Sequence, residues 1–368
     1  SDTVHTAITI AIISGLIMAF VGLIFSKGAL ELMDTPEDVI GQAALYMRIY
    51  FIGMPFFMLY NYGAAVLRAV GDTKRPLMFL IVSGCINAVL NLILVIGFSL
   101  SVVGVAVATV ISQMISCILV LRCLYKSEGS YQLRFSKLKI NKKYMIQIFQ
   151  VGVPAGIQST VINFSNVLLQ SSVNSFGSVA MAGYTAANNI LGFLYQSINS
   201  VTQACMSFTS QNYGAGEKER CRKALRIAML EGMLMTAVFS SVMMLSGDFL
   251  VRFYTTDTEV IKYALIRMKH VMLLEAMTGT YEMTAAALRG LGRSMLPAII
   301  TVVGSVVFRI IWIYTVFARY HSFGMLLNVY IVSWIITGTA MIIAYILVSR
   351  KVLGHTRAGG KAAETAAV

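Results

Sequence analysis

The amino-acid sequence predicts an all-α, polytopic membrane protein, and three observations lead to that prediction. The 368 residues are 57% hydrophobic and only 12% charged, with a mean hydropathy of +0.76, whereas soluble domains carry about 25% charged residues. Nearly every apolar run reaches the roughly 20 residues that a helix needs to cross a bilayer. Finally, the segment Thr35–Pro76 recurs without a gap as Thr256–Pro297.

The duplication points to a class of function as well as to a fold. Internal repeats in an apolar chain are typical of the related halves of secondary transporters. The two copies share residues that include Tyr60 with Tyr281, Leu67-Arg68 with Leu288-Arg289, Gly71 with Gly292 and Pro76 with Pro297.

Hydropathy along the chain predicts ten membrane-spanning helices, with kinks expected at Pro55 and Pro154. Several of these helices are longer than a bilayer requires, so we expect them to tilt or protrude. The expected spans are residues 4–25, 41–69, 77–98, 102–125, 144–176, 179–211, 224–246, 258–289, 295–317 and 323–349.

The duplication also predicts the organisation of the complete fold. Two spans precede the second copy but have no partner before the first, so two further helices are expected ahead of residue 1. The fold would then have twelve helices in two pseudosymmetric six-helix lobes. The expected parts are 1–125 as the remainder of the N-terminal lobe, 126–143 as a cytoplasmic linker, 144–350 as the C-terminal lobe and 351–368 as a cytoplasmic tail.

The distribution of charge predicts the orientation in the membrane. The chain has 29 Lys and Arg against 16 Asp and Glu, and its basic residues gather at alternate connections, as the positive-inside rule requires. This pattern predicts that both chain ends lie in the cytoplasm and argues against a nucleic-acid partner. We expect the protein in the plasma membrane. The basic clusters are Arg68 to Arg75, Arg122 to Lys143, Lys218 to Arg226, Arg289 to Arg293 and Arg350 to Lys361.

Motifs for other chemistries are missing from the sequence. The five cysteines have no metal-binding spacing and predict no disulfide. The glycines of Gln211–Gly216 lack the order of a nucleotide-binding loop, and no side chain sits in a nucleophile motif. We therefore expect neither an enzyme nor a cofactor.

Four motifs carry a resemblance to a known family. Leu67-Arg-Ala-Val-Gly-Asp-Thr-Lys-Arg-Pro76 precedes Asn87-x-x-x-Asn91, and Leu288–Pro297 is its counterpart in the second half. Gly152–Gln158 and Gln211–Gly216 complete the set. In order and spacing these motifs resemble the multidrug and toxic compound extrusion (MATE) family.

The resemblance implies an antiporter that exports cationic, amphipathic small molecules in exchange for Na⁺ or H⁺ by alternating access of two lobes. It implies a monomer whose partners are its substrates and membrane lipid. Matching positions imply an ion site, with Na⁺ as the candidate metal, at Asn61, Asn87, Asn91 and Thr109. A flippase or exporter of lipid-linked or other metabolites in the same superfamily is the alternative. That function would be expected to need a cavity rich in Arg and Lys, for which Arg309 is the one candidate.

The residues themselves leave two interpretations of the asparagine pair open. Asn87 and Asn91 are one helical turn apart, so both amides lie on one face, which must point into the bundle. They either form interhelical hydrogen bonds or provide the hard oxygen ligands that a sodium ion accepts.

Intramembrane charges in the second half are candidate functional residues because burying them is costly. Glu282 occupies the position of Asn61, and Arg309 aligns beside that of Asn87, so we expect a buried Glu282–Arg309 ion pair that is either a structural lock or a protonation switch. Glu275 and Glu231 receive no role. Arg267, like Arg48 and Lys269, is expected to reach the outer headgroups, with contact to substrate as the alternative.

Polar side chains recur at helical spacing on two spans, where contact with lipid would be costly. These stripes predict the wall of a substrate cavity, and an aromatic residue beside them would suit flat hydrophobic cations. The candidates are Gln158, Asn163, Asn166, Gln170, Asn188, Gln196, Asn199, Gln203 and Tyr281.

Overall fold

The computed structural model describes residues 2–32 and 37–354, and all regular secondary structure within them is helical. The predicted all-α class is therefore confirmed. The chain divides into two compact units, Ser1–Phe149 and Gln150–Val368. The expected cytoplasmic tail lies outside the described residues beyond Gly354.

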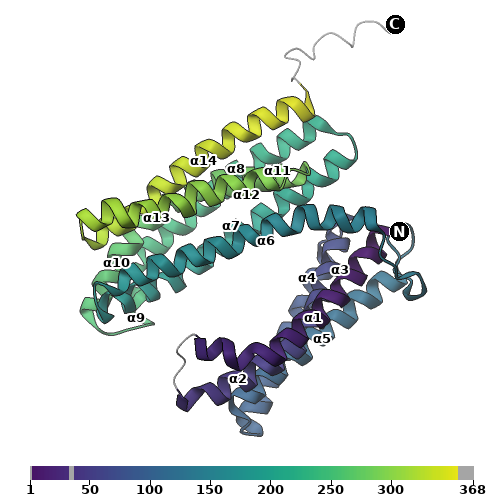
Figure 1. Ribbon diagram of the computed structural model, residues 1–368, viewed down its shortest axis with the longest axis horizontal. Helices are drawn as coiled ribbons and strands as arrows, with labels where there is room; N and C mark the ends of the chain where they lie inside the picture. Colours follow the sequence, from purple (N-terminus) through teal and green to yellow (C-terminus); the bar gives the residue numbers. More distant parts are fainter. Residues whose placement is uncertain (1, 33–36, 355–368) are drawn as a thin grey trace, which may run out of the picture. The chain divides into compact units, whose positions relative to one another are not determined.

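The first unit is a bundle in which α1 packs against α2 and α3, and α5 packs against α2, α3 and α4 (Figure 1). Its core includes the fully buried side chains of Ile8, Leu67 and Leu124. The elements are α1 (Asp2–Leu32), α2 (Glu37–Ile52), α3 (Met54–Ala69), α4 (Lys74–Asn91), the π-helical η1 (Leu92–Gly97), α5 (Ser101–Lys126) and the 3-10 turn η2 (Phe135–Lys137).

A bend of 44° separates α2 from α3 at Gly53. Pro55 lies in the first turn of α3, where its missing N–H costs nothing. A Cβ at Gly53 would lie 2.9 Å from Gln113 Oε1 and 2.9 Å from Val110 Cγ2, so the close approach to α5 requires a glycine. The kink expected at Pro55 is confirmed, whereas Pro154 lies inside the continuous helix α6 (Lys142–Asn174).

The segment between α5 and α6 is fastened to the N-terminal end of α1. Arg134 N donates to His5 Nε2 at 3.1 Å, and Asn141 N donates to Thr6 Oγ1 at 3.1 Å. Leu133 is fully buried in the core of the same unit. The expected linker is thus docked on the first unit by both apolar and polar contacts.

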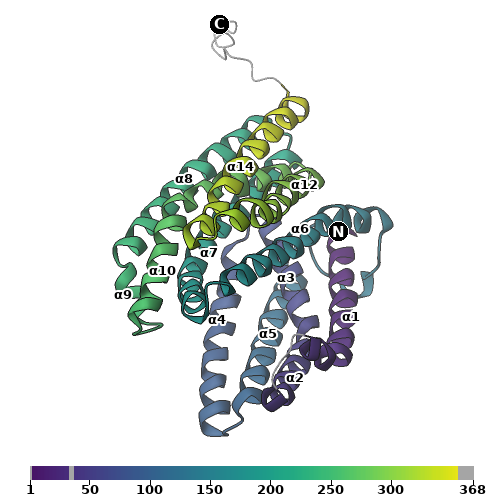
Figure 2. The same cartoon turned by 60° about the vertical axis from the view of Figure 1, so that its left-hand side comes forward.

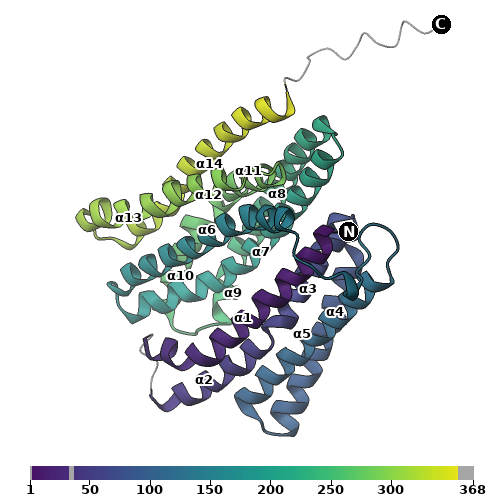
Figure 3. The same ribbon diagram turned by 45° about the vertical axis from the view of Figure 1, so that its right-hand side comes forward.

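In the second unit, α7 packs against α8, α10 and α11, and α14 packs against α10 and α11 (Figures 2 and 3). After α6, its elements are α7 (Ser178–Gly214), α8 (Lys218–Leu245), α9 (Gly247–Arg252), α10 (Thr258–Val271), the 3-10 stretch η3 (Met272–Met277), α11 (Thr278–Gly290), α12 (Met295–Thr301), the π-helical η4 (Val302–Val307), α13 (Phe308–Trp312), the π-helical η5 (Ile313–Phe317) and α14 (Phe323–Leu353).

The duplicated segments break their helices at equivalent places. Gly53, at the bend of the first copy, corresponds to Leu274, which lies within η3 of the second copy. The π-helical stretch η1 likewise corresponds to η5. Irregular turns inside long helices are common at functional sites, and both copies retain them.

Seven helices of the described chain are long and apolar enough to cross a membrane, or eight if the bent pair α2–α3 counts as one span. All ten expected segments are helical, but α7 and the α10–α11 segment are not among these seven or eight. These helices carry much of the polar wall described below, which lowers their hydropathy. The number of spans therefore stays a prediction.

Candidate functional site

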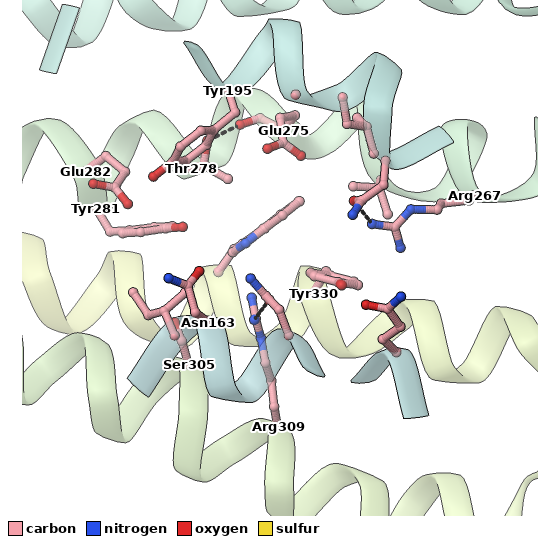
Figure 4. A pocket seen from close by; sticks show the side chains of 18 of the residues that line it. Asn163, Tyr195, Arg267, Glu275, Thr278, Tyr281, Glu282, Ser305, Arg309 and Tyr330 are labelled. Atoms are coloured by element: carbon pink, nitrogen blue, oxygen red, sulfur yellow. Dashed lines mark hydrogen bonds between the residues drawn. The ribbon is translucent and has the colours of Figure 1, made fainter. Parts of the chain in front are cut away.

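The second unit contains a cavity of about 370 Å³ that is lined by polar, charged and aromatic side chains (Figure 4). Helices α6, α7, α10, α11 and α14 contribute to its wall, as do η3, η4 and α13. The residues used below are Asn163, Asn166, Gln170, Tyr184, Asn188, Tyr195, Arg267, Glu275, Tyr281, Glu282, Arg309, Tyr330 and Trp334.

Arg267 lies inside this cavity wall and is only 3% exposed. Its guanidinium carbon is 3.7 Å from the ring centre of Tyr184, and Nη2 donates to Asn188 Oδ1 at 2.8 Å. The hydroxyls of Tyr184 and Tyr330 are 2.8 Å apart. The arginine is therefore held by aromatic stacking and an amide.

The prediction that Arg267 reaches the outer headgroups is wrong. Residues two apart on a helix lie about 200° apart around its axis, so Arg267 and Lys269 face opposite ways. Lys269 and Arg48 are exposed, as expected of headgroup contacts, and Arg267 is buried. Helical spacing within α10 was the signal that could have separated them.

Close packing of α7 on α10 brings Tyr184 to Arg267. A Cβ at the preceding residue, Gly183, would lie 2.7 Å from Tyr263 Cβ and 2.7 Å from Val260 O. Only a glycine lets the two backbones approach this closely. The neighbouring tyrosine then meets the arginine side chain.

The predicted ion pair between Glu282 and Arg309 does not form in this structure. Arg309 Nη1 donates instead to Asn166 Oδ1 at 3.1 Å, and its guanidinium carbon lies 4.8 Å from the ring centre of Tyr330. Arg309 sits on α13, between the π-helical stretches η4 and η5. Alignment of the repeats could not anticipate that α6 supplies the acceptor, and Figure 4 shows Glu282 well away from Arg309.

A second cavity of about 410 Å³ adjoins the first and shares Ile162, Tyr195 and Glu282 with it. Arg289 Nη2 donates to Gln158 Oε1 at 2.7 Å in its wall. The two hydrogen bonds from Arg289 and Arg309 tie α6 to α11 and α13. Polar space thus continues through the second unit past Glu282.

The predicted cavity-wall residues are largely brought together by the fold. The first cavity is lined by Asn163, Asn166, Gln170, Asn188 and Tyr281, and the second is lined by Gln158, Asn199 and Gln203. Gln196 is exposed and lines neither cavity.

Several residues of the first cavity had no assigned role in the sequence, among them Glu275, Tyr330 and Trp334. Glu275 is 8% exposed and belongs to the 3-10 stretch η3, while Tyr330 and Trp334 come from α14. The spacing of Tyr330 and Trp334, one helical turn, was a usable signal for a shared face. Glu231 is exposed on α8 and lines neither cavity.

The first unit has its own cavity of about 420 Å³, and it contains three of the four predicted ion ligands, namely Asn61, Asn87 and Thr109. Asn91 is not among the lining residues and donates through Nδ2 to Asn87 Oδ1 at 3.1 Å. Asn87 Nδ2 donates in turn to Ser112 Oγ at 3.3 Å.

These side chains supply neutral oxygen atoms, which are acceptable ligands for a small hard cation. Asn91 Oδ1 is buried and has no hydrogen-bond partner among the described residues. Arg68 lines the same cavity, and no carboxylate does. The described residues therefore offer a cation oxygen atoms without a compensating negative charge.

Comparison with solved structures agrees with this architecture. The chain matches an outward-facing multidrug resistance MATE family transporter of the MOP superfamily with a TM-score of 0.85, 20% identity and coverage of 95% of this chain and 78% of the other. It matches a MOP superfamily transporter from Pyrococcus furiosus with a TM-score of 0.87, 20% identity and coverage of 96% and 80%. At this identity the matches show the fold.

Sequence relatives share the same family. The probable multidrug resistance protein YoeA of Bacillus subtilis is 30% identical over 81% of this chain and 66% of its own length. The multidrug export protein MepA of Staphylococcus aureus is 23% identical over 91% and 74%. The chain thus spans about two thirds of the first relative and about three quarters of the second.

The family model MatE matches residues 1–93 and 154–315, which hold the duplicated motifs and most of the residues lining the three cavities. Members of this family are membrane transporters rather than enzymes. The chain therefore belongs to the MatE family and is an integral membrane protein.

Proposed function

We propose that this protein is a secondary active antiporter that exports cationic, amphipathic compounds in exchange for Na⁺ or H⁺. The observation that carries the proposal is that both halves of a duplicated membrane fold contain a polar cavity, of about 420 Å³ in one unit and 370 Å³ in the other. In transporters built from repeats, the two halves move against each other around substrate and ion sites, so polar cavities in both halves support this mechanism. The names of YoeA and MepA, a probable multidrug resistance protein and a multidrug export protein, support the export of drugs.

The coupling ion would bind in the first unit. Asn61, Asn87, Asn91 and Thr109 provide its oxygen ligands, and the orphaned carbonyl of Asn91 would gain a partner. We propose residues 1–125 and 144–350 as parts of the two lobes that alternate access, with both chain ends in the cytoplasm and the protein in the plasma membrane. The distribution of basic residues supports this orientation.

The transported compound would bind in the second unit. Tyr195, Tyr281 and Trp334 provide aromatic faces, and Glu275 and Glu282 provide negative charge. Aromatic rings attract cations through their electron-rich faces, more strongly when water is excluded. Flat organic cations fit this lining.

One observation favours a second candidate, a flippase or exporter of lipid-linked or other metabolites. Arg267 joins Arg309 in the cavity wall, so the site is more basic than the sequence predicted. A pyrophosphate group would be drawn to such a pair. The carboxylates of Glu275 and Glu282 in the same cavity weaken that attraction, which makes antiport of cations the first choice.

Uptake of a fluorescent cationic dye into inside-out membrane vesicles tests the proposal. The sodium and proton gradients are imposed separately, so the gradient that drives uptake identifies the ion. We expect Asn87→Ala to weaken coupling and Glu282→Gln to weaken dye transport, while Arg252→Gln, at an exposed ion pair with Asp248, leaves both unchanged. Folded protein that takes up no dye under either gradient would contradict antiport and favour the flippase.

A further inference from the structure

We propose that the end of the second-unit cavity formed by Arg267, Arg309 and Tyr330 binds a carboxylate group of the transported compound. This inference rests on the proposed function, because it assumes that a solute occupies the cavity. It changes the expected substrate from a simple cation to an aromatic compound that carries a carboxylate, including zwitterions.

The first argument is that both guanidinium groups are buried without a counter-charge in contact. Arg267 is 3% and Arg309 is 6% exposed. No Asp or Glu oxygen of the described chain lies within 4.0 Å of either group. Buried charges are normally paired, because an isolated charge in a low-dielectric interior is costly.

The second argument concerns the hydrogen bonds that the arginines make. Each guanidinium group donates one hydrogen bond to a neutral amide. Arg267 donates to Asn188 Oδ1, and Arg309 donates to Asn166 Oδ1. Nε and Nη1 of Arg267 and Nε of Arg309 are buried and make no hydrogen bond of good geometry to the described residues, although the Tyr330 hydroxyl lies close enough to Arg267 to interact with it. The amides therefore orient the guanidinium planes but leave donors for another acceptor.

The charge of this end of the cavity selects a monoanion. Arg267 and Arg309 contribute two positive charges, and Glu275, in the same wall, contributes one negative charge. The resulting charge of about +1 matches a single carboxylate, whose two oxygens suit the fork of an arginine. A pyrophosphate carries more negative charge than this end can compensate.

The remaining walls fit the rest of such a molecule. Tyr184 and Tyr330 stack on the arginines, and Trp334 lies one turn from Tyr330 on α14. In Figure 4, Glu282 and Tyr281 lie at the end away from Arg267. An aromatic zwitterion could place its carboxylate at the arginines and its positive group toward Glu282.

Two dyes that differ only in whether their carboxylate is free provide the test. Rhodamine 110 has a free carboxylate, and rhodamine 123 is its methyl ester with the same cationic ring system. Binding of each dye to the full chain in lipid nanodiscs is measured by fluorescence polarisation at neutral pH. We expect Arg309→Gln and Arg267→Gln to weaken binding of rhodamine 110 by about tenfold or more, the loss of one charge-assisted hydrogen bond.

The same variants should bind rhodamine 123 within about twofold of the unmodified protein, and that binding also shows that each variant is folded. Arg309→Lys keeps the charge and should lose less rhodamine 110 binding than Arg309→Gln. The matched control Arg319→Gln, at an exposed arginine stacked on Tyr320, should change neither dye.

Several results would overturn the inference. Equal losses for both dyes would show that the arginines act structurally, and no loss for either would show that the carboxylate binds elsewhere. Displacement of rhodamine 110 by millimolar pyrophosphate but not by benzoate would assign the site to a diphosphate. A different result would overturn the proposed function and not this inference, namely failure of dye transport under every gradient while rhodamine 110 still binds through the arginines.

Discussion

The cavities of the two units are built on equivalent residues of the duplication and differ in charge. Tyr60 and Arg68 line the first cavity, and their counterparts Tyr281 and Arg289 line the cavities of the second unit. Between them, Asn61 is replaced by Glu282. The comparison teaches that the repeat preserves the scaffold of the cavity while single positions decide its electrostatics.

Helix geometry follows the same rule. Both copies interrupt the long helix before the cavity, by a bend at Gly53 in one and by the 3-10 stretch η3 in the other. The interruption in the second copy carries Glu275, whereas the equivalent part of the first copy is apolar up to Phe56. Both cavities therefore contain amides and at least one guanidinium group, and only the second contains carboxylates among the described residues.

The largest expected effect on stability comes from reversing a charge in the 370 Å³ cavity of the second unit. Arg309→Glu removes the hydrogen bond to Asn166 and places a third carboxylate in a wall that already holds Glu275 and Glu282. An uncompensated buried charge costs about 3–5 kcal/mol, so thermal unfolding in detergent should occur at a much lower temperature. Arg319→Glu, at an exposed position, is the control. Equal stability of the two variants would show that this cavity of the second unit tolerates either sign of charge.

Packing of α7 on α10 gives the next largest effect. Gly183→Val would force its side chain against Tyr263 and Val260 and should destabilise the second unit by about 1–3 kcal/mol. Gly156→Val is the matched control, since no atom lies within 4 Å of a Cβ at that position. Unfolding midpoints that coincide for the two variants would refute the close approach that brings Tyr184 to Arg267.

A smaller effect is expected from the tyrosine pair. Tyr184→Phe loses the hydroxyl contact of 2.8 Å with Tyr330 but keeps the ring on Arg267, which should cost about 1 kcal/mol. Tyr195→Phe, at a half-exposed ring, should cost less. Chemical unfolding curves of the two variants measure the difference, and a greater loss for Tyr195→Phe would contradict the cluster.

The smallest effect belongs to the amides of the first unit. Asn87→Ala removes the interhelical hydrogen bond to Ser112 of α5, and such bonds in membranes contribute about 0.6 kcal/mol. It also removes a hydrogen bond from Asn91 within α4. Asn61→Ala removes only a bond to Phe57 O of its own helix and should cost still less. A loss of several kcal/mol for Asn87→Ala would mean that the amide cluster is a structural core of its unit.

The sequence predicted the helices well because periodicity and hydropathy act locally. The expected segments are helical, and the stripes on α6 and α7 do reach the cavities, apart from Gln196. The hydrogen-bond partners of the charged side chains were harder to predict, because they depend on which atoms of distant helices come within hydrogen-bond distance. For that reason the sequence did not predict that Arg309 donates to Asn166 rather than pairing with Glu282.

Burial of Arg267 could be predicted in part. Its angular separation from Lys269 placed it on the inward face, but the tyrosine that receives it depends on the contact at Gly183. The irregular turn that carries Glu275 and the stretch η5 contain neither proline nor glycine, and only η4 has a local marker, the pair Gly304-Ser305. Local pattern therefore fixes the helices, and tertiary packing fixes the charged site.

The most direct test of the account exchanges the charge between equivalent positions of the two copies. Gradient-driven dye uptake into liposomes is measured for Glu282→Asn, for Asn61→Glu and for the double variant. We expect Glu282→Asn to reduce uptake by about tenfold or more, as loss of a charged contact does, and the double variant to remain as impaired as Glu282→Asn. Full uptake by Glu282→Asn, or its recovery in the double variant, would show that the placement of the carboxylate in the second unit does not matter.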